Sequence, residues 1–147
     1  MTTINLCPVD AKNAGDAREW ALCNYFGCER SKHDSLPYDK ASDLSVGDMN
    51  ISIKASGFSL MSGALCEGRE TFDEIWSLFI ERVHSNRFAY VTSNWTAYMM
   101  NLNEFDSFVH EFGYIERESS KNGGAVKIRC KKESKKMLAW LEGAIAV

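Results

Sequence analysis

Residues 43–56, DLSVGDMNISIKAS, form two short alternating runs around a Gly-Asp pair and predict a β-hairpin. Successive side chains of a strand point to opposite faces, so Lys54 lies on the polar face, and Asp43 joins it there if the hairpin pairs in simple register. A carboxylate that can bind a divalent cation, beside a lysine that can orient or deprotonate a water, is the minimum equipment for metal-assisted phosphodiester hydrolysis. A favourable cross-strand pair of opposite charges has the same pattern, and this plainer interpretation stays open.

A third group that could take part is Glu19, in a segment whose apolar spacing predicts a helix over residues 13–26. Glu19, Leu22 and Phe26 are related by i, i+3 and i+7, so Glu19 lies along the apolar stripe that faces the sheet. A carboxylate in that position needs a partner or a cation, because burying it unpaired is costly. The alternatives are an ion pair with Lys54 or a side chain that reaches the solvent.

These residues resemble the motif of the PD-(D/E)xK nuclease superfamily, whose members have the restriction-endonuclease-like fold. The family pattern is a helix glutamate, then an aspartate, then an acid-x-Lys tripeptide further along the chain. Glu19, Asp43 and the Ser-Ile-Lys tripeptide at residues 52–54 occupy these places here. The resemblance covers residues 13–56 by motif, and the helix, strand and helix expected after them are compatible with the family's αβββαβ core.

The resemblance implies that Asp43 is the principal metal ligand, that Glu19 is an accessory ligand, and that the backbone carbonyl of Ile53 lies near the metal. Lys54 would position the attacking water and stabilise the developing charge. Ser52 stands where the family has its second acid, and a hydroxyl binds a hard divalent cation less well than a carboxylate does. Either another acid has taken over this role, or metal binding is weak, or the fold has lost catalysis. The candidate acids are Glu19, Asp39 and Asp48.

The positive charge of the chain is concentrated near its C-terminus. Between residues 121 and 136, Glu133 is the only acid among seven lysines and arginines, although the whole chain has a net charge of -3. Basic blocks of this kind neutralise phosphates, whereas lysines on an edge strand also prevent aggregation. The residues expected to contact nucleic acid are Lys121, Lys127, Arg129, Lys131 and Lys132, with Arg30 and Lys32 from the loop before the hairpin.

The elements that must position these residues predict an α/β (α+β) fold, a restriction-endonuclease-like mixed β-sheet flanked by helices. A T-x-x-E capping box begins a second helix at Thr71, and Gly113 is expected to end a third. Trp95 is the tryptophan expected to be most exposed, where it could stack on a base. The remaining expected segments are strands at 87–93, 97–102, 114–118 and 125–130, and a helix from 134. The buried stripe of the first helix is expected to include Ala14, Ala17, Ala21, Leu22 and Tyr25.

The length and composition predict a single domain that spans residues 1–147. The chain is 45% hydrophobic and 25% charged, with two prolines and no low-complexity run, which excludes a disordered or fibrous class. Its five scattered cysteines form no CxxC pair, so neither a disulfide framework nor a zinc knuckle is indicated, and a reducing cytoplasm fits best. No signal peptide or membrane-spanning segment is expected, and the protein is predicted to be cytoplasmic.

The sequence therefore predicts a metal-dependent DNA endonuclease that uses Mg²⁺ or Mn²⁺. A chain of this length has no room for a separate recognition domain, so specificity is limited, or a homodimer or a protein partner supplies it. The alternative is a catalytically inactive nuclease-fold module of phage or mobile-element type that binds DNA or protein.

Overall fold

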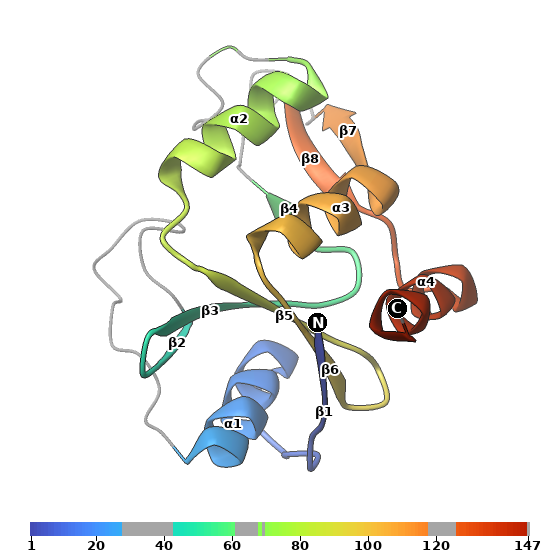
Figure 1. Ribbon diagram of the computed structural model, residues 1–147. Coiled ribbons are helices and arrows are strands. Elements are labelled where there is room, and N and C mark those ends of the chain that lie inside the picture. The colour runs from blue at the N-terminus through green and yellow to red at the C-terminus, as the bar shows by residue number, and fades with distance from the viewer. Residues whose placement is uncertain (28–42, 61–67, 69, 118–125, 147) are drawn as a thin grey trace.

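The computed structural model describes residues 1–27, 43–60, 68, 70–117 and 126–146. These contain four helices and eight strands, which confirms the mixed α/β class (Figure 1). In chain order they are β1 (Thr2–Asn5), α1 (Ala14–Phe26), β2 (Leu44–Val46), β3 (Met49–Lys54), β4 (Ser59–Leu60), α2 (Phe72–Arg82), β5 (Arg87–Val91), β6 (Thr96–Met100), α3 (Leu102–Phe112), β7 (Gly113–Arg117), β8 (Val126–Cys130) and α4 (Lys135–Ala146).

The strands form two sheets, where the sequence predicted one. The larger sheet has the order β1-β6-β5-β3-β2, and within it only β3 and β5 pair in parallel. The smaller sheet is antiparallel, with the order β4-β8-β7. The short strands β1 and β4 were not predicted, because runs of four and two residues carry too little periodicity to be recognised.

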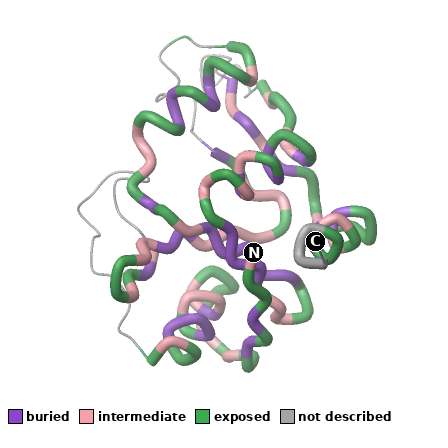
Figure 2. The backbone as a smooth tube through the Cα atoms, viewed as in Figure 1, coloured by how far each residue is buried: buried purple, intermediate pink, exposed green. Residues whose placement is uncertain are grey.

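The larger sheet separates two hydrophobic cores, as its strand alternation requires. Ala89 and Val91 of β5 pack on the side of α1, whereas Phe88 and Tyr90 pack with residues of α2, α3 and the smaller sheet. Figure 1 shows α1 on one side of this sheet and α2 and α3 on the other. The buried stretch along β5 in Figure 2 reflects this double coverage, because both faces of the strand are shielded from water.

Gly113 ends α3 as predicted: it is the C-cap, with a φ of -86°, and it also begins β7. Two other details of the predicted elements are wrong. Ala14 and Tyr25 of α1 are exposed, since the helix buries Ala17, Ala21, Leu22 and Cys23 instead. Trp20 is the exposed tryptophan, at 44%, and Trp95 is only partly exposed.

The helix starts, in contrast, follow the local sequence closely. Thr71 and Glu74 form the predicted capping box of α2, and Asn13 caps α1 by accepting a hydrogen bond from the Asp16 N–H at 2.8 Å. Gly27 ends α1 at a φ of 65°. No helix among the described residues is long and apolar enough to cross a membrane.

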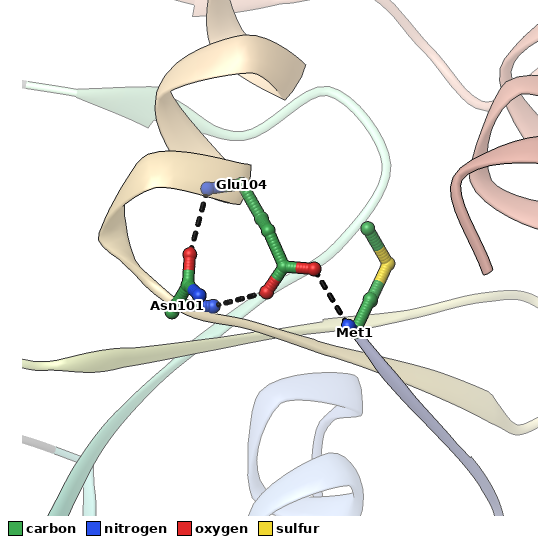
Figure 3. Close-up of polar contacts among 3 residues, drawn as sticks. All are labelled: Met1, Asn101 and Glu104. Carbon is green, nitrogen blue, oxygen red and sulfur yellow. Dashed lines mark hydrogen bonds and ion pairs between the residues drawn. The ribbon is translucent and has the colours of Figure 1, made fainter. Parts of the chain in front are cut away.

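Glu104 joins the start of α3 to the first residue of the chain (Figure 3). It completes a capping box with Asn101 and forms an ion pair with the Met1 ammonium at 2.7 Å. Partial burial on its own would raise the pKa of Glu104, but the Asn101 backbone N–H and the Met1 ammonium lower it below the ordinary value of 4.5. The charged carboxylate therefore stabilises the folded state.

Replacement of Glu104 by Gln should lower the free energy of unfolding by about 1 kcal/mol near neutral pH, because Gln retains the capping oxygen but loses the charge. A carboxylate with a lowered pKa contributes stability above its unfolded pKa and loses that contribution as the pH falls through its folded pKa. Urea unfolding of both proteins at about pH 6 and about pH 3 should therefore show a difference only at the higher pH. An equal difference at both values would contradict this assignment.

Candidate functional site

The hairpin of β2 and β3 brings Asp43 beside the end of β3. Leu44 pairs with Ile51 and Val46 with Met49 across a turn in which Gly47 has a φ of 56°, so the simple register predicted for this hairpin is confirmed. The Asp43 Oδ2 accepts a hydrogen bond from the Ile53 N–H at 2.8 Å. This bond extends the contact between the two strands beyond the Leu44–Ile51 pair, and it fixes the carboxylate against the backbone of β3.

Asp43, Glu19 and Lys54 line a single pocket of about 220 Å³. The pocket lies between the N-terminal half of α1 and the end of β3, and it is referred to below as the Asp43 pocket. The hairpin and the helix therefore bring three residues that lie far apart in the sequence to one place. Its complete lining is Gly15, Asp16, Arg18, Glu19, Asp43, Ile53, Lys54 and Ala55.

Glu19 is half-buried in α1 and does not lie on the outer face of the helix. It therefore lies on the side of α1 that meets the end of β3. Asp16 and Arg18 also line the Asp43 pocket but were not singled out from the sequence. Asp16 precedes Glu19 by three residues, so helical spacing alone places both carboxylates on the same side of α1 and could have identified it.

Lys54 is half-buried, and its position depends on the turn that follows β3. Its Nζ lies 5.8 Å from the centroid of the Phe58 ring. Phe58 is held there by a turn in which its N–H donates to the Ala55 carbonyl at 3.1 Å, with Gly57 at a φ of 72°. The cation–π contact holds the ammonium group over Phe58, which packs against the core on the α2 and α3 side of the larger sheet.

Ser52 is 5% exposed and does not line the Asp43 pocket. It pairs with Phe88 of β5, whose side chain packs in the core on the α2 and α3 side, so Ser52 lies on that covered face of the sheet. The structure therefore places Ser52 outside the pocket that the other three predicted catalytic residues line. Asp48, a candidate replacement acid, lies in the hairpin turn at the opposite end from Asp43, and Asp39 lies outside the described residues.

The ion predicted for the Asp43 pocket is magnesium, and it would meet few protein ligands there. The pocket lining contains the two predicted carboxylate ligands, Asp43 and Glu19, together with Ile53. No group of three or more His, Cys, Asp or Glu residues in the described part of the chain is arranged to hold a metal ion. Mg²⁺ commonly binds through one or two carboxylates and takes its other oxygens from water and substrate phosphate, so two acids suffice for this ion.

The basic block divides into two groups with different surroundings. Lys127 and Arg129 of β8 approach the Glu116 carboxylate at 3.7 Å and 3.3 Å, so part of their charge is already compensated. Lys131 and Lys132 are exposed and follow directly after β8. Lys121, Arg30 and Lys32, also predicted to contact nucleic acid, lie outside the described residues.

The segment after β8 runs beside the turn that follows Lys54. The Glu133 N–H donates to the Ser56 hydroxyl at 2.8 Å, and the Cys130 N–H donates to the Phe58 carbonyl at 2.8 Å. The Cγ of Lys132 lies 3.7 Å from the point where a Cβ on Gly57 would be. Lys132 thus lies beside the turn that follows Lys54, although the two lysines are more than seventy residues apart in the sequence, and the N–H of Lys131 donates to the Phe112 carbonyl.

Comparison of the chain with models of protein families, with curated proteins and with solved structures gives no match. Membership of the PD-(D/E)xK superfamily therefore remains a prediction from residues 13–56. The function of the chain is inferred from the residues that line the Asp43 pocket and from the exposed lysines after β8.

Proposed function

We propose that this chain is a metal-dependent endonuclease that hydrolyses DNA phosphodiester bonds at the Asp43 pocket. The observation that supports the proposal is that Asp43, Glu19 and Lys54, chosen from separate sequence segments, line the same pocket. Lys131 and Lys132 are exposed cations in the segment beside the turn that follows Lys54, and we assign them to the DNA backbone. The proposal includes membership of the PD-(D/E)xK superfamily and a restriction-endonuclease-like fold.

The proposed reaction is hydrolysis of a phosphodiester, in which water attacks phosphorus and displaces one ester oxygen. Asp43 and Glu19 would hold Mg²⁺ or Mn²⁺ with the Ile53 carbonyl, and the ion supplies Lewis acidity to the phosphate. Lys54 orients the water and stabilises the charge that develops on phosphorus-bound oxygen as the new P–O bond forms. The ester P–O bond breaks, the leaving oxygen takes up a proton, and the attacking water loses one to solvent.

A second candidate function, a catalytically inactive module that binds DNA or protein, is favoured by Ser52. The position where the family has its second acid is a buried hydroxyl outside the pocket. This loss leaves the metal with fewer protein ligands than the family motif supplies. The inactive module predicts salt-sensitive DNA binding without turnover and without any dependence on divalent cations.

The experiment that separates the two functions is incubation of the purified protein with supercoiled plasmid in Mg²⁺, in Mn²⁺ and in EDTA. The nuclease proposal predicts nicked and linear products with either metal and none in EDTA. Retardation of the plasmid in all three conditions with no cleavage in any of them would favour the inactive module.

The double substitution of Lys131 and Lys132 by Gln should weaken DNA binding and reduce the slope of log K against log salt by about 2, because each lysine that contacts a phosphate contributes about 1 to the slope. The matched control is the double substitution of Lys127 and Arg129 by Gln, because Glu116 already compensates part of these charges. Fluorescence anisotropy with labelled DNA over a range of salt concentrations measures both slopes. Equal slopes for the two variants would contradict the placement of the DNA path beside Gly57.

A further inference from the structure

A second pocket of about 210 Å³ adjoins the Asp43 pocket, since Arg18 and Ala55 line both. It lies between α1 and the turn that joins β5 to β6, and it is called the Trp95 pocket below. Ala14, Ala17 and Val91 give it a lining of small apolar side chains. A flat aromatic group can enter such a space without displacing a bulky residue.

Trp95 is held in the wall of this pocket in an unusual conformation. Its φ of 66° makes it the non-glycine residue with positive φ in the described part of the chain, and such a conformation costs about 1–3 kcal/mol. Hydrogen bonds enforce it: the Trp95 N–H donates to the Thr92 carbonyl at 3.1 Å, and the Trp95 carbonyl accepts from the Leu6 N–H at 2.8 Å. The surrounding backbone thus maintains a strained residue in the lining of a pocket, and strained residues of this kind cluster at functional positions.

The rim of the Trp95 pocket is polar and is tied to the basic segment. Ser93 donates its hydroxyl hydrogen bond to the Glu133 carboxylate at 2.7 Å, and Ser56 accepts from the Glu133 N–H. Glu133 directly follows Lys132, so the rim is continuous with the lysines assigned to the DNA backbone. The pocket lining therefore combines an aromatic residue and small apolar residues with one cation, Arg18, and exposed lysines precede Glu133 in the chain.

We infer, on the basis of the proposed nuclease function, that the Trp95 pocket holds one unstacked base of the strand that is cleaved at the Asp43 pocket. Stacking on an aromatic side chain tolerates any base, and Arg18, which is common to both pockets, contacts the phosphate between the two sites. A base inside a duplex cannot enter a pocket without leaving its stack. The substrate class is therefore single-stranded or locally unpaired DNA.

The test compares binding of an oligothymidylate with binding of an abasic sugar-phosphate chain of equal length, in EDTA so that no hydrolysis occurs. The wild type should bind the oligothymidylate about tenfold more tightly, because stacking of one base is worth about 1–3 kcal/mol. Trp95→Gly should abolish this difference while relieving the positive φ. Ala14→Leu should also abolish it, because it fills the pocket from an exposed position of α1. Trp20→Ala, which removes an exposed tryptophan of the same helix, should preserve it.

Equal binding of the two chains by the wild type would overturn the inference, as would a base-dependent affinity that survives in both pocket variants. Thermal melting identifies a variant that does not fold. Trp95→Gly and Ala14→Leu change different elements, so a single folded variant is enough to test the pocket. Plasmid cleavage by the wild type is measured in parallel. Cleavage without base-dependent binding contradicts the Trp95 pocket alone, whereas absence of cleavage contradicts the nuclease function.

Discussion

Asp43→Asn is expected to reduce the rate of DNA cleavage by roughly a thousandfold, equivalent to about 4 kcal/mol of transition-state stabilisation. The amide retains an oxygen that can accept the Ile53 N–H, so the hairpin pairing survives and the loss falls on the charge. Without that charge the Asp43 pocket binds a divalent cation poorly. Single-turnover cleavage of a labelled duplex or single strand in Mg²⁺ measures the effect.

The matched control for Asp43→Asn is Asp48→Asn, which removes an acid from the other end of the same hairpin. This variant has the same change in net charge and should cleave at the rate of the wild type. A similar loss in both variants would show that the overall charge of the hairpin matters and that the pocket does not. A wild-type rate for Asp43→Asn would remove Asp43 from the mechanism.

Lys54→Met is expected to lower the single-turnover rate by about 100- to 1,000-fold, the usual cost of removing one group that stabilises developing charge. Methionine has a similar length and still packs on Phe58, since a thioether contacts aromatic rings favourably. The affinity for DNA should change little, because the contribution of Lys54 is concentrated in the transition state. Cleavage rates at saturating enzyme and anisotropy titrations separate the two effects.

Lys136→Met removes an exposed lysine of α4 and serves as the control for Lys54→Met. Its cleavage rate at saturating enzyme should equal that of the wild type. If Lys54→Met lost affinity and rate in the same proportion as this control, Lys54 would be an ordinary contact to the DNA backbone.

Local patterns were sufficient to predict the four helices and most of the strands. The Thr71 capping box, the Gly47 turn and the alternation in β3 are determined by neighbours in the sequence, and the structure confirms each of them. The division into two sheets could not be predicted in this way. It depends on the pairing of β4 with β8, which joins residues that are far apart in the chain and carries no local signal.

In the candidate site, too, some features follow from neighbouring residues in the sequence and others depend on tertiary contacts. Helical and strand periodicity was the basis for expecting Glu19 and Lys54 in one site, and both residues line the Asp43 pocket. Periodicity could not show that Ser52 is enclosed, because the alternation of β3 is the same whether or not its polar face is covered. Nor could it show that Glu116 compensates Lys127, or that Lys132 lies beside Gly57, since both contacts are made by tertiary structure.

The most direct measurement of the central claim is cleavage of DNA in Mg²⁺ and ¹⁸O-labelled water, with mass analysis of the product phosphates. Attack by water at the Asp43 pocket predicts one ¹⁸O atom in each new terminal phosphate of the wild-type reaction and of Asp48→Asn, and no product from Asp43→Asn. Absence of product from the wild type, or labelled product from Asp43→Asn at the wild-type rate, would contradict hydrolysis at the Asp43 pocket.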